Sequence, residues 1–105
     1  MRKPKIIAEW RELADAYQPP KDATFKQEAG AGEFDEFLRV HIVKTLVYGW
    51  ERGLRGEDLR KHVDDERRLC IRKHNERSGY VYWQRDMSNM ESFMDMLLRM
   101  VKHHA

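Results

Sequence analysis

Hydrophobic residues recur at spacings of three and four residues along most of this chain, which is the period of an α-helix packed on one face. The first such segment runs from about Pro4 to Tyr17, and its apolar face comprises Ile6, Ile7, Trp10, Leu13, Ala14 and Tyr17. Pro19-Pro20 ends this segment, because proline cannot continue a helix. Residues 18–32 show little periodicity, so we expect a loop there with Phe25 as its apolar anchor.

A second helix is predicted from about Glu33 to Arg52, with Gly53 as its left-handed C-terminal cap. Its apolar residues form two stripes on opposite sides, Phe34, Phe37, Leu38, Ile42, Thr45 and Leu46 in one and Val40, Val43, Val47 and Trp50 in the other. A helix that is apolar nearly all round is buried on most of its sides. We therefore expect this helix to be the central element of the fold.

The last two helices differ in how much of their surface is apolar. The third, from about Glu57 to Arg77, has a thin apolar stripe of Leu59, Val63, Leu69 and Cys70. A short aromatic link over residues 80–84 precedes the fourth helix, which is predicted to open with a capping box of Ser88 and Glu91 and to run to about His103. Apolar residues of this last helix spread over an arc of roughly 200°, about twice what packing on one side requires.

These elements predict an all-α fold, a compact four-helix domain over residues 1–105 with the second helix at its centre. The chain begins with Met1 and is long enough for one hydrophobic core, so we expect one complete domain. No apolar run approaches the ~20 residues that cross a bilayer, no secretory signal is recognisable, and Cys70 is the only cysteine. The expected location is the cytoplasm, without membrane contact.

Charge is balanced overall but segregated along the chain. The net charge is +2, whereas the segment from Arg67 to Arg85 holds six basic residues and one acid, which leaves the remaining residues at −3. Arginines bind phosphates, and the neighbouring aromatic rings stack on unpaired bases. The residues predicted to contact nucleic acid or an acidic partner are Arg67, Arg68, Arg72, Lys73, Arg77, Arg85, Tyr82 and Trp83. The alternative is a solvated helix face whose aromatic residues turn inward.

Within this segment, five residues separate Arg68 from His74. This spacing resembles the catalytic motif of the HEPN ribonucleases, helical domains that pair two such motifs across a dimer. The resemblance covers seven residues and implies that Arg68 would stabilise a scissile phosphate while His74 would act as general acid or base. An HEPN-like ribonuclease is therefore our third hypothesis.

Other chemistry finds little support in the sequence. His62 and Glu66 are four residues apart on the third helix, and His41 could face them, but no metal-binding motif surrounds these residues. Cys70 lies between Leu69 and Ile71, where a thiol behaves as a small apolar side chain. We predict no catalytic residue, no metal and no cofactor.

Methionine provides the strongest functional signal, because five of the six lie between residues 87 and 100. Flexible thioether side chains suit adaptable protein contacts. We predict a protein interface on the fourth helix, formed by Met90, Phe93, Met96, Leu97 and Met100. The favoured function is a non-catalytic binding or regulatory protein, a homodimer that docks on a protein or nucleoprotein target as small phage-type inhibitors do. The alternative is a nucleic-acid-binding protein that uses residues 67–85.

Overall fold

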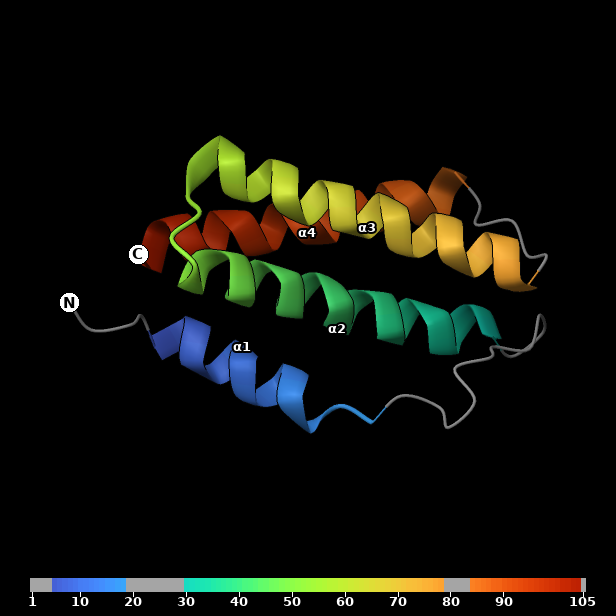
Figure 1. Cartoon of the computed structure of the whole chain (residues 1–105), viewed down its shortest axis with the longest axis horizontal. Helices are drawn as coiled ribbons and strands as arrows, with labels where there is room; N and C mark the ends of the chain where they lie inside the picture. The colour runs from blue at the N-terminus through green and yellow to red at the C-terminus, as the bar shows by residue number, and fades with distance from the viewer. Residues whose placement is uncertain (1–4, 19–29, 79–83, 105) are drawn as a thin grey trace.

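Four α-helices form the part of the chain that this computed structural model describes, which comprises residues 5–18, 30–78 and 84–104. They are α1 (Lys5–Ala16), α2 (Gly30–Glu51), α3 (Gly56–Ser78) and α4 (Gln84–His104). Consecutive helices run antiparallel, and α1, α2 and α3 lie side by side with α4 behind them (Figure 1). The predicted all-α class is thus confirmed for the described residues.

α2 is the central helix, as its two apolar stripes predict, and it contacts α1, α3 and α4. One of its faces buries Phe34, Leu38 and Ile42 completely, and Val47 is buried on the other side. Full burial of a large apolar side chain contributes roughly 1.5–3 kcal/mol to stability. α2 therefore makes the largest contribution to the core.

The other helices add shorter buried lines to this core. The residues are Ile7 from α1, Leu59, Val63 and Ile71 from α3, and Met90, Met94, Leu97 and Val101 from α4. The apolar stripe predicted for α3 needs two corrections. Ile71, which the predicted stripe leaves out, is buried, and Leu69, which it includes, is only half-buried. Val63, Arg67 and Ile71 follow at four-residue spacing, so the face of α3 that packs inward is rotated from the predicted stripe and includes a charged residue.

The turn between α2 and α3 ends α2 and reverses the direction of the chain. Gly53 has a φ of 99°, in the left-handed region, as predicted for a C-terminal cap. The amide of Leu54 donates to the carbonyl of Gly49 (3.0 Å), and the amide of Gly53 donates to that of Trp50 (3.0 Å). These two bonds form a Schellman motif, which ends α2 and directs the chain back along it.

The predicted start of the last helix is wrong. α4 begins at Gln84, four residues before Ser88, so Ser88 lies inside the helix and is not its N-cap. Glutamine, arginine and methionine are good helix formers, and nothing in residues 84–87 stops a helix from extending in the N-terminal direction. Residues 80–83 of the predicted aromatic link and Phe25 lie outside the described residues.

Candidate protein-binding surface

The apolar side chains of α4 form two rows, one buried and one exposed. Met90, Met94 and Leu97 point into the core, with at most 4% of each residue exposed. Two residues predicted to form a protein interface, Met90 and Leu97, are therefore core residues of the chain itself. Their spacing of four and three residues keeps them on the side of α4 that faces α2.

The other three predicted interface residues form what we call the α4 surface: Phe93, Met96 and Met100. Met96 is 41% exposed and Met100 is 37% exposed, so both long apolar side chains reach the solvent. Phe93 is half-buried, and the guanidinium of Arg39 from α2 lies 4.7 Å from its ring centre. The spacing of three and four residues aligns these side chains along one edge of α4.

A third exposed apolar residue lies on α1, where the sequence pattern predicts burial. Leu13 is 68% exposed, whereas Ile7 and Ala14 on the same helix are buried. At 100° per residue, the side chains of Leu13 and Ile7 are about 120° apart around α1, so Leu13 does not lie on the face that packs on α2. The apolar face predicted for this helix is thus wider than the face that packs.

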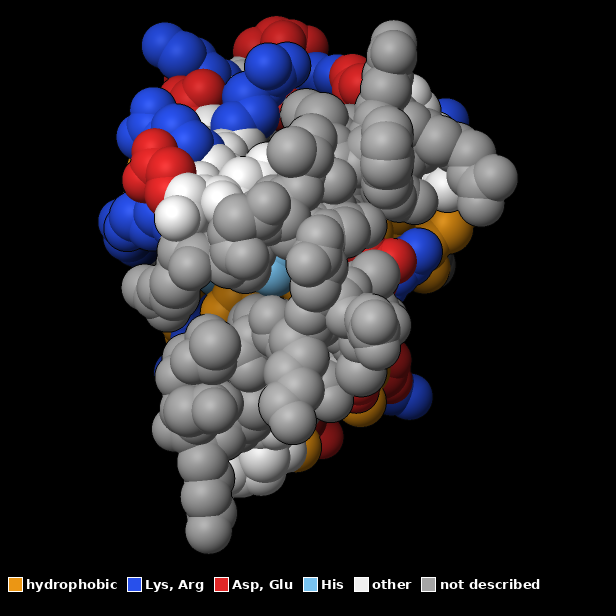
Figure 2. Space-filling view, turned by 90° about the vertical axis from the view of Figure 1, so that its right-hand side faces the viewer, with side chains coloured by type: hydrophobic (Ala, Val, Ile, Leu, Met, Phe, Trp, Pro, Cys, Tyr) orange, Lys and Arg blue, Asp and Glu red, His pale blue; other side chains and the backbone are white. Residues whose placement is uncertain are grey.

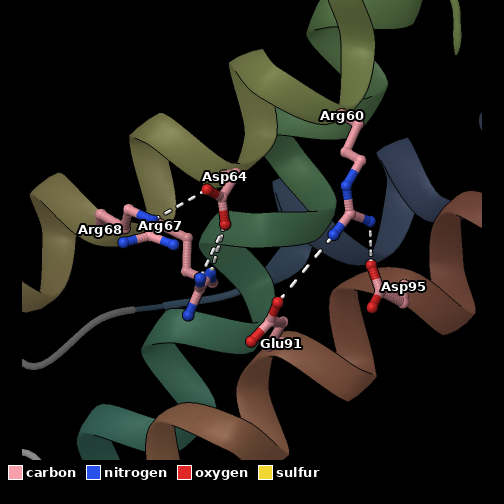
Figure 3. A network of polar contacts seen from close by, with 6 residues as sticks. All are labelled: Arg60, Asp64, Arg67, Arg68, Glu91 and Asp95. Atoms are coloured by element: carbon pink, nitrogen blue, oxygen red, sulfur yellow. Dashed lines mark hydrogen bonds and ion pairs between the residues drawn. The ribbon is translucent and has the colours of Figure 1, made fainter. Parts of the chain in front are cut away.

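The opposite edge of α4 is polar and is joined to α3 by ion pairs (Figure 3). Arg60 of α3 contacts Asp95 and lies 4.0 Å from the carboxylate of Glu91. Asp64 accepts hydrogen bonds from Arg67 (2.7 Å) and from Arg68 (2.8 Å). Met96 and Met100 lie on the other edge, away from these ion pairs.

Asp64 holds Arg67 inside the molecule, which corrects a predicted surface contact. The side chain of Arg67 is 2% exposed, so its guanidinium does not face solvent as a phosphate ligand would. Partial burial acts to raise the pKa of Asp64, but the hydrogen bonds from Arg67 and Arg68 outweigh it and the net shift is downward. The pair stays charged and anchors this turn of α3.

The remaining basic residues of the 67–85 segment that the structure describes are exposed but are interleaved with acids. Arg68 pairs with Asp64, and Arg72 lies 4.0 Å from Glu76. Lys73 is also exposed. Figure 2 shows Lys and Arg side chains gathered over α3, at the upper left, with Asp and Glu among them. Tyr82, Trp83 and the side chains of Arg77 and Arg85 lie outside the description.

The two residues of the HEPN-like spacing face different environments. Arg68 is 62% exposed and pairs with Asp64, whereas His74 is buried and stacks on Phe34 with ring centres 3.8 Å apart. Six positions along a helix place two side chains about 120° apart around its axis. Within one chain, therefore, Arg68 and His74 do not converge on a shared site.

A shallow polar pocket of about 570 Å³ lies over α2 between α1 and α3. Its lining residues are Arg11, Thr45, Tyr48, Glu51, Arg52, His62 and Glu66. As the sequence suggested, His41 faces Glu66, with 3.8 Å between Nε2 and the carboxylate. His62 pairs instead with Arg52 (3.0 Å). No group of three or more His, Cys, Asp or Glu residues in the described ranges could hold a metal ion.

Two titratable groups near this pocket are shifted by burial. Burial lowers the pKa of His41, although the neighbouring Glu66 acts in the other direction. Burial, together with Glu66, raises the pKa of the Cys70 thiol to about 11. A thiol with such a pKa is almost entirely protonated at neutral pH, so Cys70 is a poor nucleophile.

None of the described helices is long and apolar enough to cross a bilayer. No known protein family, curated protein or solved structure matches this chain. The α4 surface and the polar pocket are thus the two candidate sites, and the α4 surface is the one that exposes long apolar side chains, those of Met96 and Met100.

Proposed function

We propose that this protein is a non-catalytic binding or regulatory protein that docks on a protein partner through the α4 surface. The observation that supports this proposal is the exposure of Met96 (41%) and Met100 (37%) beside the half-buried Phe93. Methionine side chains adapt their shape to a partner and make favourable contacts with aromatic rings. A protein surface is the partner that this chemistry fits best.

The electrostatics of α3 support a protein partner over nucleic acid. Nucleic-acid affinity arises mainly from cations that are free to neutralise phosphates. On α3, Arg67 is buried against Asp64, and Arg68 shares the same carboxylate. Much of the positive charge in the described part of the basic segment is therefore compensated within the chain.

Capture from the native host tests the proposal. The bait proteins are the wild type, the Met96→Glu/Met100→Glu variant and the control Lys61→Gln/Lys73→Gln, which makes the same change of −2 in net charge at two exposed positions of α3. Circular dichroism should show equal helicity, because all four positions are exposed. Proteins held by the wild type and by the control should be lost from the Met96→Glu/Met100→Glu bait. A set of bound proteins that is the same for all three baits would contradict the proposal.

A further inference from the structure

The exposed apolar residue of α1 lies near two acidic residues of the same helix. We call Glu9, Glu12 and Leu13 the α1 surface; all three are exposed. Arg11 does not neutralise this surface, because its guanidinium turns to α2 and pairs with Glu51 at 2.8 Å. Lys5 lies 3.9 Å from Glu9, and no described residue forms an ion pair with Glu12. The α1 surface is thus an apolar side chain with excess negative charge beside it.

The α4 surface has the opposite charge at its borders. From Leu97 to His104, α4 carries Arg99 and Lys102 and no acid. Both basic residues are exposed, and no described residue forms an ion pair with Arg99 or Lys102. Arg99 follows Met96 by three residues and so neighbours it on the surface of α4, whereas Lys102 lies about 120° from Met96 around the helix. The positive charge of Arg99 complements the negative charge around Leu13.

We infer that the α4 surface binds the α1 surface of a second copy of this chain, which identifies the partner of the surface in the proposed function and rests on that function. Leu13 of one copy packs on Met96 and Met100 of the other, and Glu9 and Glu12 lie near Arg99. α1 contacts α4 within the chain, so both surfaces belong to neighbouring helices. A two-fold axis then forms the contact twice.

A second copy fits these surfaces better than an unrelated chain, because every copy carries both the α1 surface and the α4 surface that complements it. Each half pairs apolar side chains with a charge that the other half neutralises. Around a two-fold axis each copy uses its α1 surface and its α4 surface at the same time, so the assembly closes as a dimer. Neither surface remains exposed in the dimer.

Light scattering after size exclusion tests the inference. The wild type should have twice the 12.7 kDa chain mass at micromolar concentration. Leu13→Glu and Met96→Glu/Met100→Glu should each be folded monomers, because either change breaks both copies of the contact. Ala8→Glu, which adds a charge to α1 away from Leu13, should remain dimeric.

Charge reversal tests the pairing of the two surfaces directly. Glu12→Arg and Arg99→Glu should each raise the dissociation constant of the dimer about tenfold or more, since like charges then face each other. The double variant Glu12→Arg/Arg99→Glu should restore the wild-type value to within a few fold. Restoration of dimerisation by the second change is not expected from independent damage at two sites.

Three outcomes would overturn the inference. The wild type could be monomeric at high concentration, or the losses of dimer affinity caused by Glu12→Arg and Arg99→Glu could add up in the double variant. The third outcome is a Leu13→Glu protein that remains dimeric. If Leu13→Glu remains dimeric while Met96→Glu/Met100→Glu is monomeric, α4 packs on α4, and the proposed function survives without the α1 contact. The capture experiment decides the proposed function separately, because it registers any protein whose binding requires Met96 and Met100.

Discussion

At the scale of single residues, the position of a residue in the helical period predicts its burial on α3 better than its residue type does. Val63, Arg67 and Ile71 follow at four-residue spacing, and His74 continues the same line. All four are buried. The sequence predicts a surface contact for Arg67 because arginine is usually exposed, and it singles out His74 only through the HEPN-like spacing. Their position on this line was the signal in the sequence that places them inside.

The ion pair between Asp64 and Arg67 should stabilise the fold in a pH-dependent manner. Asp64→Asn leaves a 2%-exposed guanidinium without its charged partner, so the free energy of unfolding should fall by about 1–3 kcal/mol at pH 7. The exposed Asp65→Asn is the matched control and should change stability by less than about 0.5 kcal/mol. Urea denaturation followed by circular dichroism measures both.

The pH dependence of this effect has a definite sign. The folded-state pKa of Asp64 is lowered, so its contribution is complete above the unfolded-state pKa of about 4 and is lost as pH falls through the folded-state pKa. The stability difference between wild type and Asp64→Asn should therefore shrink in acid. A difference that stays constant from pH 7 to pH 3 would show that Asp64 acts through packing alone.

His74 should behave as a packing residue. His74→Ala removes a ring stacked 3.8 Å from Phe34 and should lower the free energy of unfolding by about 2 kcal/mol. His74→Phe, which keeps an aromatic ring, should lose less stability, and the exposed Lys73→Ala should lose almost none. We expect the wild type not to cleave RNA. RNA cleavage that disappears in a folded His74→Ala protein would support the HEPN-like alternative.

At the scale of helices, the sequence predicts the number of elements and the central position of α2, because periodicity is averaged over many turns. The apolar arc of α4 predicts exposed methionines, but its breadth does not say which half faces the core. For this reason the predicted interface combines Met96 and Met100, which are exposed, with Met90 and Leu97, which are buried. The helix start at Ser88 was inferred from two residues alone, and a local signal of this kind is easily overridden.

Ser88 should respond to substitution as a helix-interior residue. At an N-cap, alanine costs about 0.5–2 kcal/mol and glycine only a few tenths. Inside a helix the order reverses, because glycine is roughly 1 kcal/mol worse than alanine. We expect Ser88→Ala to be as stable as the wild type and Ser88→Gly to be the less stable variant. Thermal denaturation of the two proteins would show the opposite order if Ser88 were a cap.

Gly49 should be required for the close packing of α2 on α3. A Cβ at this position would lie 3.0 Å from His62 and 3.0 Å from Leu59. Gly49→Val adds two further methyl groups to this contact and should destabilise the fold by about 1–3 kcal/mol. Gly49→Ala should lose less, because higher helix propensity offsets part of the contact. If the valine variant is as stable as the alanine variant in urea, α2 and α3 are farther apart than described.

At the scale of the whole molecule, acidic residues of α3 neutralise much of the positive charge on the same helix. Arg68 and Arg72 each have a carboxylate within 4.0 Å. A total of 20 basic and 18 acidic residues does not reveal this pairing, because pairing depends on which residues share a helix face. The surface is consequently less attractive to phosphates than the basic segment suggests.

Nucleic-acid binding should therefore be weak, independent of sequence and sensitive to salt. In fluorescence anisotropy titrations, affinity should fall with salt, and the log–log slope should be about −0.7 to −0.9 per phosphate neutralised. Arg68→Ala/Arg72→Ala should weaken binding more than Lys5→Ala/Lys44→Ala, which removes two exposed cations from other helices. Tight binding in 200 mM salt with a preference for one sequence would favour the nucleic-acid-binding alternative.

α1 is attached to the rest of the molecule by fewer buried groups than any other described helix, with only Ile7 and Ala14 buried. Two polar contacts reinforce it, from Arg11 to Glu51 and from Tyr48 to Asp15. Because few of its side chains are fully buried, the amides of α1 should exchange with deuterium through a local opening while α2, α3 and α4 remain closed. A second copy bound to Leu13 would oppose that opening, so deuterium uptake by α1 should slow as protein concentration rises.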